Sequence, residues 1–414
     1  MTKKVVIIGG GFGGIAAARA LKNDDVQVTL IDKTNHHLFL PLIYQVATSV
    51  LSPSDVAAPI REVLRKQRNV RVIMATVDKI DTAAKQVEAS GLRYDYDYLI
   101  ISSGVRNSYF GNETWEQFAP GLKTLSDAIT IRENILTSLE KAECECPVGE
   151  DERLLTFVVV GGGPTGVEIA GAIAEITSRM LKDFRRLKPA ATKVILLEAA
   201  GCILGGFRPS LRASGQKALE GLGVDVRLNV KITDINKDGV HMSGGLIETA
   251  NIIWAAGARS QAFMQSVGTE TDNSGRTVVD AYCSVKEHSE VFVIGDAAVF
   301  MNSGQPLPAT APVAIQQGNY VSSVIRGEIA GNARKPFKYK DKGTIAILGT
   351  YKAVLQRGRL QVLGYPAWTI WMFLHIAVIT EFRNRYAVLA QWLWYYTTRR
   401  HGVRLITGVG RNKL

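Results

Sequence analysis

This sequence predicts an α/β fold. One unit, made of a strand, a glycine loop and a helix, occurs twice in it. The first copy is VVIIGGGFGGIAAARA at residues 5–20, and the second is FVVVGGGPTGVEIAG at residues 157–171. In each copy a run of β-branched apolar residues, typical of a buried parallel strand, precedes small residues at helical spacing. The sequence therefore predicts two Rossmann-type domains in tandem.

Length and composition fit an ordered protein of two or three domains. The chain has 414 residues, of which 46% are hydrophobic and 21% charged, as in ordinary globular proteins. Its formal net charge of +11 is unevenly distributed, since residues 331–414 hold 15 Lys and Arg against two acids, and residues 1–330 hold 34 against 36. A basic partner surface is therefore expected in the C-terminal region alone. No nucleic-acid-binding pattern accompanies it.

The first glycine loop has the pattern of a dinucleotide site. Gly9, Gly11 and Gly14 form G-x-G-x-x-G directly after the predicted strand at 4–8. The first glycine allows the turn, the second admits a pyrophosphate, and the third lets the helix pack on the strand. The next predicted strand ends in Asp32, which is 23 residues after Gly9 and suitably placed to bind a ribose.

The second loop repeats this pattern with Gly161, Gly163 and Gly166. Its strand-terminal acid is Glu198, 37 residues after Gly161, and a basic helical extension at 178–193 accounts for the longer spacing. A carboxylate at this position would repel the 2′-phosphate of NADPH. We therefore expect NADH.

Two dinucleotide domains in tandem suit a flavoprotein that holds FAD in the first and receives NADH in the second. Residues 96–104 and 251–258 are each a strand that ends in small residues near a nucleotide. Residues 290–298 add a strand followed by Asp296, which either holds the ribityl chain of FAD or caps a helix. We predict an FAD-binding domain at 1–112 and 286–335, an NADH-binding domain at 113–285 and a membrane-associating region at 336–414.

The C-terminal region combines aromatic and basic residues. Four of the six tryptophans fall between Trp368 and Trp394, with arginines interleaved, which suits a membrane interface. The apolar segment at 367–380, bounded by Pro366 and Glu381, would span roughly 21 Å as a helix, short of the roughly 30 Å hydrocarbon core. We expect two amphipathic helices in the membrane plane. A buried dimer interface or a core helix pair is the alternative.

Several longer blocks make the resemblance to a known family specific. They are NHHLFLPLIYQVATSVLSP at 35–53, APVAIQQGNYV at 311–321, GTIAILGTYKAV at 343–354 and the FRNR-containing segment 367–406. With the glycine loops they resemble the type II NADH:quinone oxidoreductases, single-subunit respiratory NADH dehydrogenases that pump no protons. These belong to the glutathione-reductase-like flavoproteins with two dinucleotide-binding domains. The resemblance covers nearly the whole chain. Two positions depart from it: many members have Gln in place of Leu40, and some have Gln in place of Pro312.

The resemblance implies hydride transfer from NADH to FAD and two-electron transfer to a membrane quinone. The C-terminal region predicts a monotopic, peripheral protein on the cytoplasmic face of the inner membrane, with a homodimer as a second use of the same helices. By the resemblance, segment 35–53 would lie over the flavin, Glu168 would be a proton-handling carboxylate near nicotinamide and quinone, and Gln316 and Gln317 would line the quinone site. A helix dipole would also favour an acid at position 168 without any catalytic role. The expected FAD contacts are Gly9, Gly11, Phe12, Gly13, Gly14, Asp32, Lys33, Tyr44, Gln45, Val77, Ser103, Gly104 and Asp296, and the expected NADH contacts are Gly161, Gly163, Pro164, Thr165, Gly166, Glu198 and Gly257.

Other chemistries fit the sequence less well. No cysteine precedes Cys144, so the cysteine pair that a dithiol reductase needs beside its flavin is missing. Cys144 and Cys146 lie in an acidic stretch, and nothing pairs Cys202 with Cys283. We expect no metal, because no set of residues with ligand spacing surrounds the two histidines at 36 and 37. A soluble reductase of a ferredoxin or rubredoxin, or a membrane-docked NADH sensor, is the alternative function.

The compartment follows from two further features. Four cysteines in the whole chain are too few for a disulfide scaffold and indicate a reducing environment. After MTKK the apolar run turns at once into glycines, which is not a signal-peptide pattern. We expect the body of the protein in the cytoplasm.

Overall fold

The computed structural model describes residues 2–144, 150–188 and 191–406. Within them the chain forms two compact units. The first unit contains the residues up to Leu38, Ala57–Arg106 and Ala258–Lys340, and the second contains Phe39–Val56, Asn107–Gly257 and the chain from Asp341 onward. The domain boundaries at 112, 285 and 335 stay a prediction. Segment 35–53, expected over the flavin, is divided between the two units, since its residues up to Leu38 belong to the first unit and the rest to the second.

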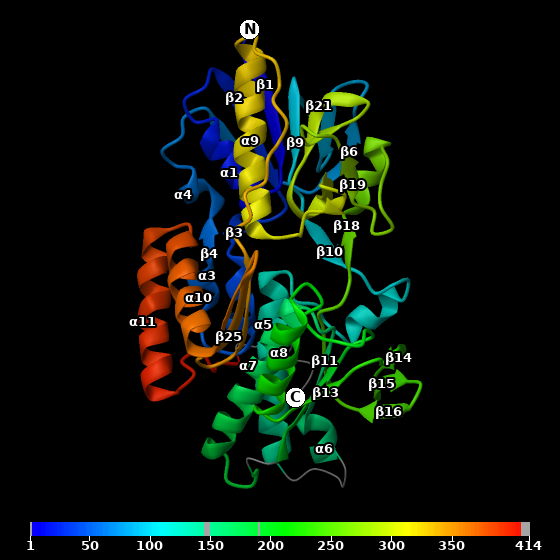
Figure 1. Cartoon of the computed structure of the whole chain (residues 1–414), viewed down its shortest axis with the longest axis vertical. Coiled ribbons are helices and arrows are strands. Elements are labelled where there is room, and N and C mark those ends of the chain that lie inside the picture. The colour runs from blue at the N-terminus through cyan, green and yellow to red at the C-terminus, as the bar shows by residue number, and fades with distance from the viewer. Residues whose placement is uncertain (1, 145–149, 189–190, 407–414) are drawn as a thin grey trace. The chain divides into compact units, whose positions relative to one another are not determined.

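The first unit is built on a six-stranded sheet in the order β20-β21-β9-β1-β2-β5. Strands β21, β9, β1, β2 and β5 run parallel, and β20 is antiparallel to β21. Helix α1 follows the first glycine loop, and α9 packs against α1 (Figure 1). The helices come so close that a Cβ on Gly318 of α9 would lie 2.4 Å from the carbonyl oxygen of Gly13.

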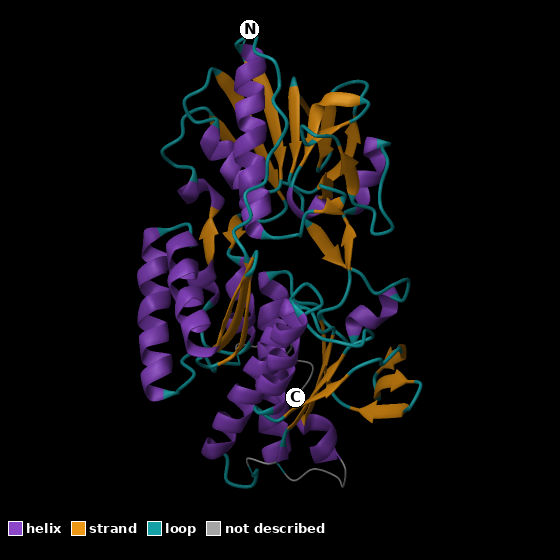
Figure 2. Cartoon of the chain, in the orientation of Figure 1, coloured by secondary structure: helices purple, strands orange, loops and turns teal. Residues whose placement is uncertain are grey.

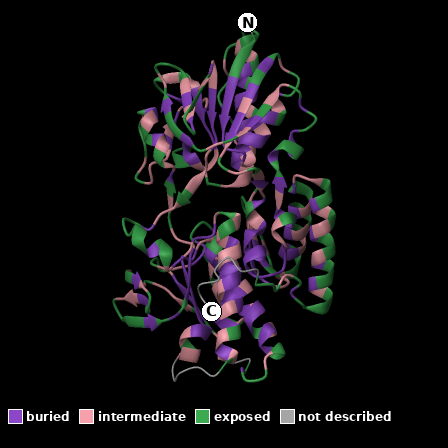
Figure 3. Cartoon of the chain, turned by 180° about the vertical axis from the view of Figure 1, so that it is seen from behind, coloured by how far each residue is buried: buried purple, intermediate pink, exposed green. Residues whose placement is uncertain are grey.

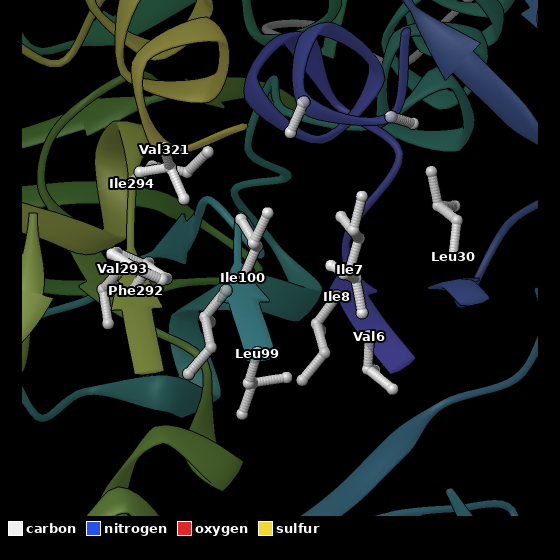
Figure 4. Packing of buried hydrophobic residues seen from close by; sticks show 14 of the residues in the cluster. Val6, Ile7, Ile8, Leu30, Leu99, Ile100, Phe292, Val293, Ile294 and Val321 are labelled. Atoms are coloured by element: carbon white, nitrogen blue, oxygen red, sulfur yellow. The ribbon is translucent and has the colours of Figure 1, made fainter. Parts of the chain in front are cut away.

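The core of this unit lies between the sheet and its helices. Ile7 of β1, Ile100 of β9 and Phe292 of β21 are each 0% exposed, and Figure 4 shows them on neighbouring strands. Val321 of α9 packs in the same cluster. Strands with apolar residues on both faces need cover on both sides, so the predicted strands at 4–8, 96–104 and 290–298 are confirmed as central strands.

The elements of the first unit follow in chain order. They are β1 (Lys3–Ile8), α1 (Phe12–Ala20), β2 (Val26–Asp32), β3 (His36–Leu38), β4 (Ala57–Pro59), α4 (Ile60–Val63), β5 (Val70–Met74), β6 (Val77–Asp81), β7 (Gln86–Ala89), β8 (Leu92–Asp95), β9 (Tyr98–Ile101), β10 (Val105–Asn107), β18 (Ala258–Ser260), η5 (Ala262–Val267), β19 (Thr277–Val279), β20 (Ser284–Val285), β21 (His288–Val293), η6 (Gly295–Ala297), β22 (Ala298–Asn302), β23 (Gln305–Pro306) and α9 (Ala311–Ile329). Asn107 at the end of β10 belongs to the second unit.

The second unit repeats the parallel arrangement. Its main sheet has the order β13-β12-β11-β17, all parallel, and α7 begins directly after the second glycine loop. The two Rossmann-type modules that the sequence predicts are therefore confirmed. The predicted helical extension after α7 is wrong beyond Asp183, because the backbone N–H groups of Arg185, Arg186 and Leu187 donate to the carboxylate of Glu143 instead of to a helix.

The C-terminal part of the second unit is a three-stranded antiparallel sheet, β24-β25-β26, followed by two helices that lie side by side (Figure 2). The sequence prediction of two helices is confirmed, although the first begins at Gly364 rather than after Pro366, and Glu381 is the N-cap of the second. In the part of the chain that the structure describes, no helix has both the length and the apolar character needed to cross a bilayer.

The elements of the second unit also follow in chain order. They are η1 (Leu40–Leu42), α2 (Ile43–Ala47), α3 (Pro53–Val56), η2 (Glu113–Gln117), α5 (Leu125–Glu143), α6 (Glu150–Leu155), β11 (Thr156–Val160), α7 (Pro164–Met180), η3 (Leu181–Asp183), β12 (Lys193–Leu197), α8 (Pro209–Glu220), β13 (Val224–Arg227), β14 (Ile232–Asn236), β15 (Gly239–Met242), β16 (Gly245–Glu248), β17 (Asn251–Trp254), β24 (Thr344–Gly349), β25 (Lys352–Arg357), β26 (Leu360–Leu363), α10 (Gly364–Val378) and α11 (Phe382–Thr398).

Candidate functional site

The first glycine loop is fixed by hydrogen bonds from its backbone N–H groups to the end of β2. The N–H of Gly9 donates to the carbonyl of Ile31 at 2.8 Å, and the N–H of Gly10 donates to Oδ2 of Asp32 at 2.6 Å. Gly9 has a φ of +99°, and a Cβ on Gly14 would lie 1.8 Å from the carbonyl oxygen of Gly9. These glycines are required by the close approach of helix to strand, as the fingerprint predicts.

The surroundings of this loop fit FAD. A Cβ on Gly11 or Gly104 would meet nothing within 4 Å, which leaves backbone accessible to a bulky group on both segments. Ser103 carries a buried Oγ with no hydrogen-bond partner among the described residues, and Asp296 lies half-buried in η6. A cradle of open backbone, with a polar atom awaiting a partner, suits a dinucleotide at the N-terminus of α1.

The other predicted contacts in the first unit have structural partners. Phe12 packs edge-to-face on His37 with the ring centroids 5.1 Å apart, and Nδ1 of His37 lies 2.9 Å from the carbonyl oxygen of Gly10. Val77 packs in the hydrophobic core at the start of β6. Lys33 is exposed directly after β2.

The two glutamines predicted to line a quinone site both bind backbone. Gln317 is 1% exposed, and its Oε1 accepts the N–H of Gly295 at 2.8 Å, so it fixes the turn that carries Asp296. Gln316 exchanges two hydrogen bonds with the backbone of Lys340. These glutamines therefore tie α9 to neighbouring segments of the first unit.

The second glycine loop reproduces the first almost contact for contact. The N–H of Gly161 donates to Leu197 O at 2.8 Å, and the N–H of Gly162 donates to Oε2 of Glu198 at 2.5 Å. A Cβ on Gly166 would lie 1.8 Å from the carbonyl oxygen of Gly161, whereas one on Gly163 would meet nothing within 4 Å. The second loop therefore has the same open backbone and close helix contact as the first, and these features fit NADH.

The remaining predicted NADH contacts lie around this loop. Pro164 and Thr165 are exposed at the first turn of α7. Gly257 has a φ of +71°, and a Cβ there would come within 2.8 Å of Ser108 O. The carboxylate of Glu198, held by the loop, lies at the end of β12 where the sequence placed a ribose.

A pocket in the second unit lies beside the same helix α7. It encloses about 390 Å³ of empty space, including its mouth. Its lining comes from α2, α7, the β24–β25 hairpin, α11 and the segment after α11. The polar side chains that line it include Tyr44, Gln45, Glu168, Glu175, Tyr395 and His401.

Glu168 is the acid of this pocket that the sequence singled out. Burial in the surrounding protein raises its pKa from 4.5 to about 8, and the N–H of Ile347, which donates to Oε1 at 3.2 Å, opposes the shift only in part. Desolvation disfavours the ionised form, so the carboxyl is protonated at neutral pH. Such a group is a proton donor matched to the pH of the cell.

Glu175, two turns further along α7, is held quite differently. Its carboxylate accepts the N–H and the hydroxyl of Thr350 at 2.7 and 2.9 Å, and the hydroxyl of Tyr395 at 3.3 Å. Arg179 lies 3.7 Å away and also donates to the hydroxyl of Tyr395 at 2.6 Å. Glu175 is therefore well supplied with hydrogen-bond donors, whereas Glu168 accepts the N–H of Ile347.

Tyr44 and Gln45 connect segment Phe39–Val56 to the C-terminal helices. Nε2 of Gln45 donates to the hydroxyl of Tyr44 at 3.0 Å, and Nε1 of Trp392 donates to Oε1 of Gln45 at 2.7 Å. Burial, followed by the nearby charge of Glu168, raises the pKa of Tyr44 well above its usual range. Tyr44 is therefore a neutral hydrogen-bonding group.

Sequence reasoning missed most of the residues around this pocket, among them Thr350, Tyr395 and His401. Thr350 and Tyr395 are 175 and 220 residues from Glu175 in the chain, and His401 belongs to a basic stretch that we interpreted only as a membrane surface. No local pattern identifies such contacts. The one available signal was the histidine itself, since it is the single histidine among the interleaved arginines after α11.

The cysteines among the described residues are not joined in a disulfide. Cys144 is exposed, Cys202 partly exposed and Cys283 buried, all three as free thiols, and burial raises the pKa of Cys283. Cys146 lies outside the described residues. Within the described ranges, no group of three or more His, Cys, Asp or Glu side chains is arranged to hold a metal ion.

Comparison with known proteins gives the family. The model of the family "Pyridine nucleotide-disulphide oxidoreductase" matches residues 3–318. The chain is 43% identical over 423 residues to "Type II NADH:quinone oxidoreductase NdhA" of Mycobacterium tuberculosis, covering 98% of this chain and 89% of that protein. It is 40% identical over 421 residues to "Type II NADH:quinone oxidoreductase Ndh" of the same organism, covering 98% and 90%.

Solved structures agree in fold. NDH2 from Plasmodium falciparum in complex with NADH superposes with a TM-score of 0.88 at 20% identity, over 96% of this chain and 98% of that chain. The sulfide:quinone oxidoreductase of Aquifex aeolicus gives a TM-score of 0.74 at 20% identity, over 97% and 96%. The duplicated glycine loops and the full-length similarity lead to one conclusion: the chain belongs to the pyridine nucleotide-disulphide oxidoreductase family and, within it, to the type II NADH:quinone oxidoreductases.

Proposed function

We propose that this chain oxidises NADH through bound FAD and passes two electrons to a quinone, without moving ions across a membrane. The observation that carries the proposal is the position of Glu168 on α7. The N-terminus of α7 forms the second dinucleotide loop, and its next turn holds a carboxyl with a pKa of about 8. A nucleotide cradle and a proton donor on one rigid helix are what a hydride-transfer site needs.

The reaction consumes one proton from solution, because NADH, one proton and a quinone give NAD⁺ and a quinol. FAD, when bound, accepts the hydride and releases two electrons. The chain's own residues bind and orient FAD and NADH. The first loop would hold FAD with Asp32, the second would hold NADH with Glu198, and Glu168 would supply the proton from its protonated carboxyl. The matched dinucleotide loops and the raised pKa support this division of roles.

The acceptor site is a further part of the proposal. We keep Gln316 and Gln317 as residues that line the quinone site. Their hydrogen bonds to Lys340 and Gly295 favour a role in shaping its wall. Leu40, where many members of the family have Gln, is 38% exposed, and Pro312 occupies the first turn of α9. In both positions an apolar side chain replaces the amide found in other members of the family.

A lipid surface is the proposed location, and it rests on the two C-terminal helices. The buried side of α10 carries Trp368, Trp371 and His375, at helical spacing. The opposite sides of α10 and α11 are exposed (Figure 3). Large apolar side chains on these exposed sides are Tyr365, Ile370, Phe373, Leu374, Val378, Phe382, Tyr386, Leu389, Leu393 and Trp394. An apolar patch of this size marks an interaction site.

The charges beside this patch favour an anionic membrane over a protein partner. Arg383, Arg385, Arg399, Arg400 and Arg404 lie in or after α11, and Glu381 is the one acid between Gly343 and the C-terminus. Each basic residue near an anionic leaflet contributes about 1 kcal/mol of attraction. We therefore propose monotopic attachment to the cytoplasmic face of the inner membrane. A homodimer through the same helices is the competing use of the patch.

The first experiment is anaerobic stopped-flow absorbance of the purified yellow protein. One equivalent of NADH should bleach the flavin rapidly, and mixing with a short-chain quinone should restore the colour rapidly. Recovery no faster than with buffer would mean that the NADH half is right and the quinone assignment wrong. A ferredoxin or rubredoxin would then be tried as acceptor.

The proposed membrane attachment is better tested by substitutions than by a truncation. Deleting residues 336–414 would remove Trp392 and leave the buried amide of Gln45 without its partner, so loss of activity would prove nothing about lipid. Phe373→Ser, Phe382→Ser and Leu393→Ser together change side chains that are 66%, 66% and 68% exposed.

This triple variant should lose binding to anionic vesicles and turnover of a long-chain quinone in them, yet keep turnover of a water-soluble quinone. Met74→Ser with Leu92→Ser, which alters exposed apolar residues of the first unit (64% and 62%), is the matched control. Unchanged vesicle binding in the triple variant, with a dimer becoming monomeric, would assign the patch to subunit contact instead.

A further inference from the structure

His401 lines the pocket beside Glu168, and the reaction as described gives it no role. It follows α11 and is 6% exposed. Its ring packs against Tyr395 with the centroids 5.1 Å apart, and it lines the same pocket as Glu168. Histidine is the side chain best suited to gain and lose a proton near neutral pH.

The hydrogen bonding of His401 fixes which ring nitrogen carries the proton. Nδ1 lies 2.9 Å from the carbonyl oxygen of Thr48. A carbonyl can only accept, so Nδ1 must be protonated in this contact. Nε2 of the neutral ring is then an acceptor. It is buried and has no hydrogen-bond partner among the described residues.

An unpaired buried acceptor is costly, at about 1–3 kcal/mol, and a water molecule in the pocket removes that cost. The pocket has room for water, since about 30 Å³ of it is open to the centre of a water-sized sphere, against the roughly 10–15 Å³ of such space that one water needs. Glu168 lines the same space as a protonated carboxyl, so it offers the donor that the ring lacks. Water between these two groups would satisfy both.

The electrostatic surroundings keep the ring neutral at rest. Burial lowers the pKa of His401 to about 4; the bond to Thr48 opposes this, and the positive charges of Arg179 and Arg404 lower the pKa further. The titratable groups that line the pocket or act on the ring are Glu168, Glu175 and Arg179 of α7, Tyr44 of α2, Tyr395 and Tyr396 of α11, and Arg404. Glu175 is hydrogen-bonded by Thr350 and Tyr395, and Glu168 is the acid whose pKa burial raises to about 8.

We infer that His401 returns a proton to Glu168 through pocket water after each turnover, and this rests on the proposed function. When the O–H bond of Glu168 breaks and its proton leaves for the reacting centre, a carboxylate remains in the pocket. That new negative charge favours imidazolium. A proton from solution then binds Nε2 of His401 and passes through water to Glu168. The ring returns to its neutral form, no electrons move, and one solution proton is consumed.

His401 thus acts on the reaction only through Glu168, as a positioning and relay residue. A purely structural role, in which the ring merely holds Thr48, is the competing explanation. The relay and the structural role can be separated, because Nδ1 of the ring bonds to Thr48 whereas Nε2 would carry the relayed proton. In His401→Asn the side-chain amide can still donate to Thr48 while Nε2 is lost. In His401→Gln the amide reaches the position of Nε2 while the bond from the Nδ1 position is lost.

The test is stopped-flow measurement of flavin reduction by NADH and of reoxidation by a water-soluble quinone between pH 6 and pH 9. His401→Asn should reduce its flavin at the wild-type rate. It should be reoxidised about tenfold or more slowly at pH 8.5, where solution protons are scarce and general acid catalysis matters most, and it should recover when free imidazole is added. His401→Gln should show a similar pH-dependent loss.

Two results would overturn the relay. One is wild-type behaviour of His401→Asn at every pH, with damage confined to His401→Gln, which would assign the ring to holding Thr48. The other is a defect of equal size across the pH range without rescue by imidazole.

Wild-type protein gives an independent check if a variant does not fold. A curved dependence of its reoxidation rate on the D₂O fraction indicates several protons in flight, and a straight line contradicts the relay. Failure of the wild-type protein to react with quinone at all would instead defeat the proposed function.

Discussion

Replacing Glu168 by Gln tests the central residue of the proposed mechanism. The amide keeps nearly the same shape but offers no transferable proton. With a pKa of about 8, about nine-tenths of the wild-type carboxyls are protonated at pH 7 and about one-tenth at pH 9. If the protonated form is the one that reacts, the rate of flavin reoxidation by quinone should fall about tenfold over that interval.

The same pKa predicts how stability depends on pH. The fold favours the protonated acid, so this group costs nothing below the unfolded pKa of 4.5 and destabilises the folded chain increasingly as the pH rises to about 8. The upper limit of that cost is about 5 kcal/mol, and partial exposure of the side chain reduces it. Glu168→Gln should therefore unfold at a higher temperature than wild type at pH 9, with little difference at pH 4.5.

The decisive assay is stopped-flow reoxidation of NADH-reduced protein, in wild type and Glu168→Gln, at intervals from pH 6 to pH 10. Wild type should show a plateau and then a decline above pH 8, and the variant should be slow and flat. Glu175→Gln, on the same helix, is the control and should keep the pH break. If the break persists unchanged in Glu168→Gln, some other group titrates and our reasoning about this carboxyl is wrong.

Three further substitutions probe the second unit. Gly166→Ala forces a Cβ to within 1.8 Å of the carbonyl of the loop's first glycine, so the protein should stay yellow but lose rapid reduction by NADH in stopped flow; full reduction would refute the loop assignment. Glu198→Gln removes the charge that repels a 2′-phosphate, and the ratio of kcat/KM for NADPH to that for NADH should rise about tenfold, since removing one unfavourable charge contact changes binding by about 1–2 kcal/mol. Trp392→Phe deprives Gln45 of its donor, at a cost of about 1–3 kcal/mol, which calorimetry should report as a lower Tm; an unchanged Tm would mean that water replaces the indole.

Local sequence patterns predicted the nucleotide cradles well. Gly9, Gly14, Asp32 and their counterparts in the second module have their roles set by a turn, a helix contact and a strand end within about 40 residues of chain. Such short-range geometry imposes strict residue types, because a Cβ 1.8 Å from a carbonyl has no alternative placement. That strictness is what makes the fingerprint visible in one sequence.

The pocket could be predicted only in part. Glu168 was found because it follows the second loop on the same helix, yet nothing near it in the chain indicates Thr350, Tyr395 or His401. Their approach depends on how α11 and the β24–β25 hairpin pack on α7, and many sequences satisfy such packing. The aromatic residues of the C-terminal region have two different roles that the sequence does not distinguish. Trp392 is buried against Gln45, whereas Trp394, two residues later, is exposed.

The bond between Trp392 and Gln45 joins residues 347 positions apart, and this separation has a consequence for how the protein is made. A ribosome adds about 5–20 residues per second, so α2 waits for some tens of seconds before the helix that covers it has been synthesised. Until then the amide of Gln45 lacks its indole partner, although α5 and α7 already pack against α2, and this part of the surface is open to wrong contacts. We therefore expect nascent chains that lack α11 to be substrates for chaperones and proteases, and cells to discard prematurely terminated copies instead of accumulating a crippled oxidoreductase.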